Sequence, residues 1–415
     1  MTSASEFTPR SRLPGWRTPL LVVLAAGCLL AVLSFGIRAS FGLFLAPMSA
    51  DFGWGREVFA IAIAVQNLLW GLSQPVAGAL ADRYGSARVL ALGALVYSGG
   101  LFLMASASTP GLLMLSTGVL VGLGVSGASF AIVLAAFARL LPEDKRSWAL
   151  GIGTAAGSAG QFFMVPLGQA FISAYGWSMA LTIFGVLALV MVPCAAALTG
   201  RSAHGGLHNL SIGGALKEAF RHPSYNLLTL GFFVCGFHVA FIQTHLPAYI
   251  TDRGLDAGLA AWALAIVGGA NIIGALSAGA LGGRFSKKYL LSLLYFARAV
   301  VIALFVLLPI SEASVLLFSF AIGLLWLSTV PLTSGLVAQF FGTQHMAMLF
   351  GIVFFSHQVG AFLGVWLGGY FFDVTGSYDV VWWGSVALGL AAAAIHWPIR
   401  EGAVVRLAPA SPTVN

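Results

Sequence analysis

The chain has 415 residues, of which 59% are hydrophobic and only 8% are charged. Ordinary soluble domains contain roughly 25% charged residues, so this composition excludes a soluble globular protein and requires lipid as the main solvent. The net charge of +7 does not indicate nucleic-acid binding, because the sequence contains no polar segment of domain length that would carry a basic patch.

The chain consists mainly of apolar runs long enough to cross a membrane. A helix needs about 20 apolar residues to span ~30 Å of hydrocarbon, and charges, Pro and Gly divide the sequence into twelve such runs. The first run lacks a small-residue cleavage site, so we predict a retained span rather than a signal peptide. The spans are expected near residues 18–47, 57–81, 87–107, 110–140, 147–173, 177–199, 226–250, 258–283, 288–309, 313–340, 347–372 and 379–399.

One long polar connection separates the first six runs from the last six. This division predicts an all-α membrane protein with an N-terminal six-helix bundle over residues 1–200 and a C-terminal six-helix bundle over residues 226–415. Residues 201–225 are expected to form a cytoplasmic linker. The two halves therefore carry equal numbers of spans.

The basic residues predict the orientation of the chain. Cytoplasmic loops of membrane proteins carry an excess of Lys and Arg, and placing both termini in the cytoplasm puts sixteen of the 20 Lys and Arg on that side. Arg56 and Arg253 then lie outside, whereas Arg38 and Arg298 lie within spans. We expect a multi-pass protein of the plasma membrane, the inner membrane of a bacterial cell.

The two halves resemble each other at an offset of about 200 residues. FGIRASFGLFLAPM (35–48) matches CGFHVAFIQTHLPAY (235–249), and Gly160 recurs as Gly360. Internal symmetry of this kind is typical of secondary transporters, whose substrate site lies between the two repeats near the middle of the membrane.

Four motifs carry a resemblance to a known family. GALADRYGSARVL (78–90) resembles the loop between spans 2 and 3 of the major facilitator superfamily. PEDKRSWALGIGTAAGSAGQ (142–161), GLFLAPMSADFGW (42–54) and QNLLWGLSQPVAGALADRYG (66–85) are similar to the branch of bacterial monocarboxylate transporters and oxalate–formate antiporters. The resemblance implies twelve helices in two pseudo-symmetric bundles that move by alternating access. It also implies a gating role for Gly78, Asp82, Arg83, Gly85, Arg88 and Arg284.

The sequence departs from this branch in the eighth span. Monocarboxylate transporters carry an acid there and, four residues later, an Arg-Pro pair, whereas this chain has Asn271 and Ala275-Leu276. Their arginine and their proton-carrying acid are therefore both missing at these positions.

Two arginines lie within spans without a carboxylate partner. All thirteen acids fall in loops, tails or span ends, and each intramembrane arginine costs about 2.5–3.5 kcal/mol before compensation. A guanidinium matches a carboxylate through two parallel hydrogen bonds. We therefore predict that Arg38 binds an anionic substrate, and in the resembling family a basic residue stands at about this place. The alternative for Arg38 and Arg298 is a structural arginine bonded to helix-end carbonyls.

Further polar side chains within spans are candidates for substrate contact. Histidine is the one mid-span residue type whose ordinary pKa suits proton coupling, although a membrane histidine also serves as a helix-to-helix hydrogen-bond donor. Gln66 and Asn67 are two more polar residues in the second span. The supporting candidates are His238, His245, Arg298, His357, Gln161 and Asn271.

These observations predict a secondary transporter of a small organic anion, expected to be a monocarboxylate, working by proton symport or by anion exchange. The alternatives are an exporter of a drug or neutral metabolite, and a membrane sensor without transport. The sequence shows no nucleophile–base pair, metal cluster or phosphate-binding loop, so enzyme activity, a cofactor and a bound metal are not expected. The expected partners are the organic anion, protons in the case of symport, and membrane lipid; we expect a monomer that binds no nucleic acid.

Overall fold

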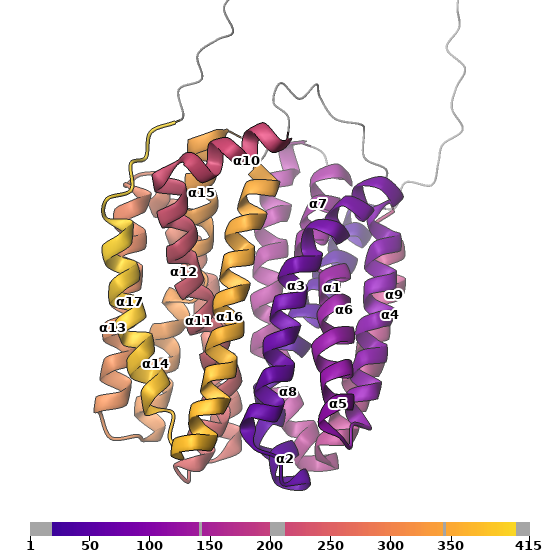
Figure 1. Ribbon diagram of the computed structural model, residues 1–415. Helices are drawn as coiled ribbons and strands as arrows, with labels where there is room; N and C mark the ends of the chain where they lie inside the picture. Colours follow the sequence, from indigo (N-terminus) through magenta and orange to yellow (C-terminus); the bar gives the residue numbers. More distant parts are fainter. Residues whose placement is uncertain (1–18, 141–142, 200–211, 343–345, 404–415) are drawn as a thin grey trace, which may run out of the picture.

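The computed structural model describes residues 19–140, 143–199, 212–342 and 346–403 (Figure 1). The predicted tails and the first part of the predicted linker lie outside the described residues. Almost every described residue belongs to a helix, and the helices run side by side along one axis. In Figure 1 the N-terminal half, coloured indigo to magenta, lies beside the C-terminal half, coloured pink to yellow.

The N-terminal half contains the first six spans. Span 1 bends where α1 gives way to α2, and span 4 is made of four consecutive pieces that include the π-helical turn η1. The elements are α1 (Leu20–Ala39), α2 (Gly42–Phe52), α3 (Arg56–Tyr84), α4 (Ser86–Ala105), α5 (Pro110–Leu113), η1 (Met114–Leu120), α6 (Val121–Gly127), α7 (Phe130–Leu140), α8 (Glu143–Leu189) and α9 (Met191–Ala196).

The C-terminal half contains the other six spans and is preceded by a short helix, α10 (Ile212–Arg221), which lies across one end of the bundle (Figure 1). Span 10 is broken between α14 and α15. The elements are α11 (Pro223–Asp252), α12 (Ala257–Gly282), α13 (Lys287–Leu307), α14 (Glu312–Leu325), α15 (Thr329–Phe341), α16 (Met346–Thr375) and α17 (Asp379–His396).

Within the described residues, eleven helical segments are long and apolar enough to cross a membrane. One of them, Ala149–Ala196, is 48 residues long and contains two of the predicted spans. The chain turns between these spans at Gly176, whose φ of 82° lies in the left-handed region that only glycine adopts easily. The chain therefore crosses twelve times, as its hydropathy predicts.

The internal repeat is visible in how the helices pack. A Cβ atom on Gly160 of α8 would collide with the Val32 carbonyl of α1, and one on Gly360 of α16 would collide with the Phe233 carbonyl of α11. Span 1 therefore packs on span 5 as span 7 packs on span 11, with a glycine at the equivalent crossing. Close backbone approach through small residues is typical of membrane helices.

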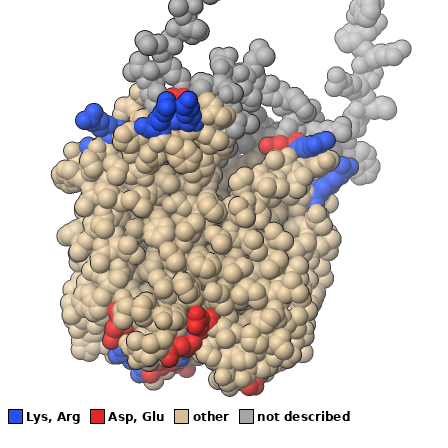
Figure 2. Space-filling view, in the orientation of Figure 1, with Lys and Arg blue, Asp and Glu red and all other residues tan. Residues whose placement is uncertain are grey.

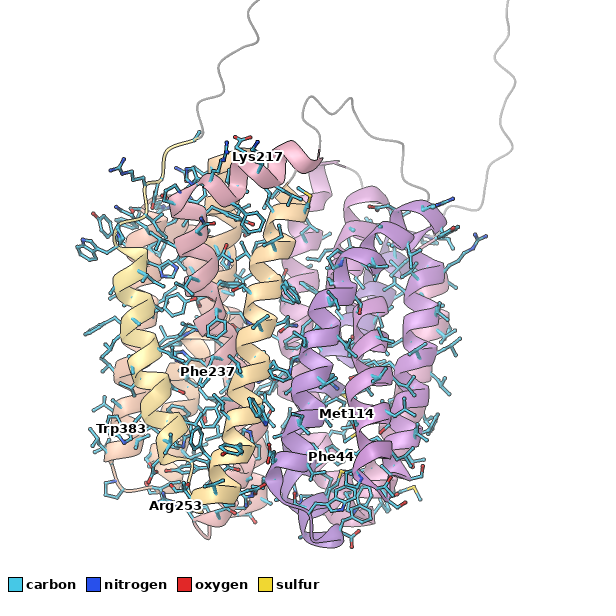
Figure 3. All side chains as sticks on the ribbon, in the orientation of Figure 1. Phe44, Met114, Lys217, Phe237, Arg253 and Trp383 are labelled. Carbon is cyan, nitrogen blue, oxygen red and sulfur yellow. The ribbon has the colours of Figure 1, made fainter. Side chains whose placement is uncertain are left out.

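The two ends of the bundle differ in charge. We call the end that holds α10 and residues 19 and 403 the linker end, and the end that holds Arg56, Asp252 and Asp373 the far end. Figure 2 shows most Lys and Arg of the visible face at the linker end and most Asp and Glu at the far end, and Figure 3 labels Lys217 at the first and Arg253 at the second. This distribution matches the predicted charge bias, and the cytoplasmic location of the linker end stays a prediction.

Candidate functional site

A pocket lies between the two halves; the space of about 240 Å³ that holds no protein atoms there includes open solvent. Its wall is formed by helices α1, α2 and α3 of one half and α11 of the other. None of the lining residues, all of them in the described part of the chain, is acidic. The lining residues are Arg38, Phe41, Gly42, Ile63, Gln66, Asn67, Ala240, Gln243 and Thr244.

Arg38 is the charged group of this pocket. Its Nη2 donates to Asn67 Oδ1 of α3, and its Nη1 makes a long 3.5 Å bond to Gln243 Oε1 of α11. The guanidinium carbon lies 4.5 Å from the centre of the Trp70 ring, a cation–π arrangement. All these partners are neutral, so they orient the guanidinium and leave its positive charge uncompensated.

The position of Arg38 follows from local structure. It lies in the last turn of α1, immediately before the bend at Ser40 and Phe41, where the chain continues into α2. Asn67 is itself fixed, because its Nδ2 donates to the Ile63 carbonyl at 2.8 Å while its Oδ1 accepts from Arg38. The guanidinium is thus held at the boundary between the halves.

The far end of the interface between the halves is closed. The Arg56 guanidinium makes two 2.6 Å bonds to the Asp252 carboxylate and donates to the Tyr378 hydroxyl at 2.8 Å. The Asp373 carboxylate accepts the backbone N–H groups of Arg56 and Glu57, both at 2.8 Å. Asp373 therefore caps the N-terminus of α3 from the opposite half, where the helix dipole favours a negative charge.

At the linker end, glycines of the helices that flank the interface are not packed against the other half. Gly78 of α3, Gly151 of α8 and Gly351 of α16 each face space in which an added Cβ atom would meet nothing within 4 Å. Closer to the far end, by contrast, a Cβ atom on Gly369 of α16 would lie 2.6 Å from Ala60 Cβ of α3. The described residues are therefore packed more closely across the interface at the far end than at the linker end.

Arg298 occupies a different environment. It is 1% exposed, and its Nε and Nη2 donate to the Leu325 carbonyl at 3.1 and 2.5 Å, while Nη2 also donates to the Trp326 carbonyl. These carbonyls are released by the break between α14 and α15. Asn271 serves the same break, because its Oδ1 accepts the Leu327 N–H at 2.9 Å. Broken backbone inside a membrane needs such partners, so both side chains have structural partners.

The three predicted histidines lie away from the pocket, and two of them, His238 and His245, bond to neighbouring helices of the C-terminal half. His238 bonds to the Ser385 carbonyl at 2.8 Å, and His245 bonds to the Val365 carbonyl at 2.8 Å through Nε2. Because carbonyls only accept, each Nε2 carries a proton. His357 lies 3.2 Å from Gln358 Oε1.

His245 is connected to the closed far end through Tyr378. The Tyr378 hydroxyl accepts from Arg56 and lies 3.3 Å from His245 Nδ1, so the phenol proton points to the imidazole. Burial raises the pKa of the Tyr378 hydroxyl, which keeps this proton in place.

Of the seven residues predicted to contact substrate, only Arg38 lines the pocket. Gln161 instead donates to the Leu264 carbonyl at 2.8 Å, and the Asn271 Nδ2 donates to Ser158 Oγ at 2.9 Å, both across the interface between the halves. Sequence reasoning missed Gln243 and Thr244. These two residues form a polar pair in the middle of the seventh span. They lie between His238 and His245, which were the candidates predicted for that span.

The predicted gating loop lies at the linker end. It joins α3 to α4 through Gly85, whose φ of 94° permits the tight turn. Arg83, Arg88 and Arg284 are exposed, and the Arg83 guanidinium lies 5.3 Å from the Tyr84 ring centre.

Two six-helix bundles that enclose a charged pocket sealed at one end define a membrane transporter. The model of the Major Facilitator Superfamily matches residues 27–365. The chain therefore belongs to the major facilitator superfamily, and the predicted twelve-helix, two-bundle fold is confirmed.

Relatives of the chain are transporters of the same superfamily. It is 28% identical over 356 residues to the MFS-type transporter YcxA of Bacillus subtilis (strain 168), covering 83% of this chain and 86% of that protein. It is 28% identical over 380 residues to monocarboxylate transporter 13 of Rattus norvegicus, covering 88% and 84%. These relatives confirm the predicted resemblance to monocarboxylate transporters.

Solved structures of the superfamily share the fold. A bacterial homologue of the human lysosomal transporter Spinster, in an inward-facing and occupied conformation, superposes with a TM-score of 0.75 at 14% identity, covering 92% of this chain and 97% of that one. The nucleoside transporter NupG superposes with a TM-score of 0.77 at 13% identity, covering 91% and 99%.

Proposed function

We propose that this carrier moves a small organic anion, a monocarboxylate, across the plasma membrane by alternating access, and that Arg38 binds the carboxylate. The observation that carries the proposal is the Arg38 guanidinium, which lines a pocket between the halves. Among the described residues its hydrogen-bond partners are the neutral side chains of Asn67 and Gln243. A carboxylate would supply the missing negative charge and accept two parallel hydrogen bonds.

The relatives support this choice of substrate. Monocarboxylate transporter 13 of Rattus norvegicus and monocarboxylate transporter 11 of Homo sapiens match 88% and 91% of this chain at 28% and 27% identity. The linker end faces the cytoplasm in this proposal, and the loop that contains Asp82 and Arg83 closes against the other half in the alternate state.

Exchange of one anion for another is the coupling mode that the pocket favours. An empty pocket leaves a positive charge inside the membrane, which is costly, so the empty carrier should change conformation more slowly than the loaded one. None of the histidines in the described spans lines the pocket. Proton symport through histidine is therefore the second candidate.

Uptake into proteoliposomes tests the proposal. Vesicles loaded with unlabelled anion, or left empty, receive labelled lactate, pyruvate, formate, oxalate or an aromatic acid, with and without a pH gradient. We expect one class of anion to enter loaded vesicles fastest and a pH gradient to have no effect on empty ones. Arg38→Gln should abolish uptake, whereas Arg253→Gln, at an exposed far-end arginine, should leave it unchanged.

Two results would contradict the proposal in different ways. Uptake that a pH gradient drives into empty vesicles would replace exchange by proton symport. Uptake by Arg38→Gln at the parent rate, or a preference for neutral compounds over every anion, would remove the anion site itself and favour the transport of a neutral metabolite.

A further inference from the structure

The beginning of α13 and the end of α17 meet at the linker end, at the edge of the C-terminal half remote from the N-terminal half (Figure 1). Two exposed aromatic side chains are in contact there. The ring centres of Tyr289 and Trp397 lie 4.9 Å apart in an edge-to-face arrangement, and the two residues are 47% and 62% exposed. The Lys288 ammonium lies 4.7 Å from the centre of the Tyr289 ring, a cation–π arrangement. We call Lys288, Tyr289 and Trp397 the aromatic–lysine cluster.

The segment that follows α17 fixes this cluster. Lys288 Nζ donates to the Trp397 carbonyl at 3.1 Å. The Glu401 carboxylate accepts the Lys288 backbone N–H at 2.7 Å and the Ser286 hydroxyl at 2.8 Å, so it is already engaged as the cap of α13. Within the described part of the chain the Lys288 ammonium has no ion pair. A neutral carbonyl therefore orients this ammonium, and its positive charge is left without a carboxylate.

The cluster also presents hydrogen-bond donors that are not in use. Among the described residues, neither the Tyr289 hydroxyl nor the Trp397 indole N–H has a hydrogen-bond partner, and the Lys288 ammonium uses one of its three N–H groups. Arg284, just before α13, and Arg400, just after α17, are exposed and add positive charge to the same two segments. Donors beside an excess of positive charge suit an anionic ligand.

An apolar stripe leads from the cluster along α13. Exposed apolar residues follow Tyr289 at intervals of three or four, which places them on one face of the helix. They are Leu293, Phe296, Val300 and Leu304. From Tyr289 to Val300 the helix rises roughly 16 Å at 1.5 Å per residue, about half of the ~30 Å hydrocarbon core. The stripe therefore has the length of an acyl chain in one leaflet, and the cluster lies at its headgroup end.

We propose that the aromatic–lysine cluster binds the headgroup of an anionic phospholipid, whose phosphate accepts from Lys288 and Trp397 while one acyl chain lies along the stripe of α13. Basic residues attract anionic lipids, and Trp and Tyr favour the membrane interface. A choline or ethanolamine headgroup would bring a second positive charge beside Lys288, where the nearby Glu401 carboxylate is already engaged. The site lies outside the pocket of Arg38, so it does not depend on which substrate is carried.

Native mass spectrometry of the purified full chain in detergent tests the inference, because it counts bound lipids one at a time. The probes are phosphatidylglycerol, phosphatidylethanolamine and phosphatidylcholine with the same two oleoyl chains. We expect the first phosphatidylglycerol to bind about 5-fold more tightly than the other lipids, since one basic group near an anionic lipid contributes roughly that factor. Lys288→Met and, separately, Trp397→Leu should remove most of this preference, whereas Lys288→Arg should keep it.

Two matched substitutions control for general loss of charge and of aromatic surface. Lys217→Met removes an exposed basic residue of α10 at the same end, and Trp383→Leu removes an exposed Trp of α17 closer to the far end (Figure 3). Both should keep the parent preference. Equal losses in Lys217→Met and Lys288→Met would show that the charge of the whole end attracts lipid, and equal affinities of the parent for the three lipids would leave only an interfacial anchor. Either result would overturn the site, and neither would affect the proposed transport, which depends on Arg38.

Discussion

Two arginines lie within spans of this protein, and they solve the same electrostatic problem in opposite ways. Arg298 is almost fully buried and donates to the carbonyls of Leu325 and Trp326 at a break in span 10. Arg38 is half-buried at a pocket, where the side-chain amides of Asn67 and Gln243 hold it from opposite halves.

The difference shows why an intramembrane charge does not identify a binding site by itself. A helix that breaks inside the membrane exposes carbonyls with partial negative charge, and an arginine satisfies them without any ligand. Neutral side-chain amides orient a guanidinium and leave its charge to be balanced. The partners of the arginine, rather than its depth, therefore separate structure from binding.

The largest expected effects come from removing each arginine in turn. Arg38→Met should reduce transport about 100-fold, since charged hydrogen bonds contribute roughly 1.5–3 kcal/mol, with little change in stability. Arg298→Met should lower the free energy of unfolding by about 2 kcal/mol, because the carbonyls at the break lose their donors. Transport assays and unfolding in mixed micelles measure the two effects. Reversed phenotypes would refute the comparison.

A third arginine sharpens the contrast, because it has an acid partner. Arg56 pairs with Asp252 across the far end, and the two side chains are 13% and 31% exposed. Solvent screens such a pair partly, so Arg56→Gln should favour opening of the far end by about 1 kcal/mol. Labelling of a cysteine introduced at Thr244, which is buried, by a reagent added at the far end should become about 5-fold faster.

The same labelling in Arg253→Gln controls for the loss of a far-end positive charge. Arg253 contacts the Tyr249 ring at 5.0 Å, and no bond from Arg253 to the other half is present among the described residues. Its removal should leave the labelling rate unchanged. An equal rate in Arg56→Gln and in the parent would show that the Arg56–Asp252 pair does not hold the far end closed.

Two asparagines extend the comparison to the neighbours of the arginines. Asn67 orients Arg38, whereas Asn271 accepts the Leu327 N–H at the break in span 10. Asn67→Leu should weaken substrate binding about 5-fold without changing stability, and Asn271→Leu should lower the free energy of unfolding by about 1 kcal/mol, the usual net value of one hydrogen bond. Substrate affinity measured together with unfolding tests both; equal effects of the two variants on both readouts would contradict the assignment.

The smallest effect is expected when the planar guanidinium of Arg38 is replaced by an ammonium group of the same charge. Arg38→Lys keeps the positive charge and loses the planar fork that matches a carboxylate. We expect the apparent Michaelis constant to rise a few-fold while the maximal rate is retained. A loss as large as that of Arg38→Met would indicate that the bonds to Asn67 and Gln243, rather than the charge, hold the substrate site together.

Much of the fold could be predicted because hydropathy is a local property. Lipid thickness fixes the length of a span, so the apolar runs locate the twelve crossings, and the glycines at 160 and 360 mark equivalent packing positions in the two halves. The helical linker segment α10 and the breaks in spans 1 and 10 were not predicted, because they depend on packing partners from distant parts of the chain.

The candidate site was harder to predict, as the residues around it show. Arg38 stood out because no acid lies near it in the sequence, and the structure places it at the pocket. His238, the counterpart of Arg38 in the repeat, instead bonds to the Ser385 carbonyl inside its own half. Gln243 took the position opposite Arg38, and no local feature of the sequence distinguishes it from Gln161.

The sequence by itself determined that the chain is a membrane protein of twelve spans in two related halves, and that it carries two positive charges which no acid in a span can balance. Only the tertiary structure decided which of these charges meets a pocket and which meets a broken helix. The physical reason is that transfer of a span into lipid depends on its own residues, whereas the partner of a polar side chain depends on which helices the fold brings beside it.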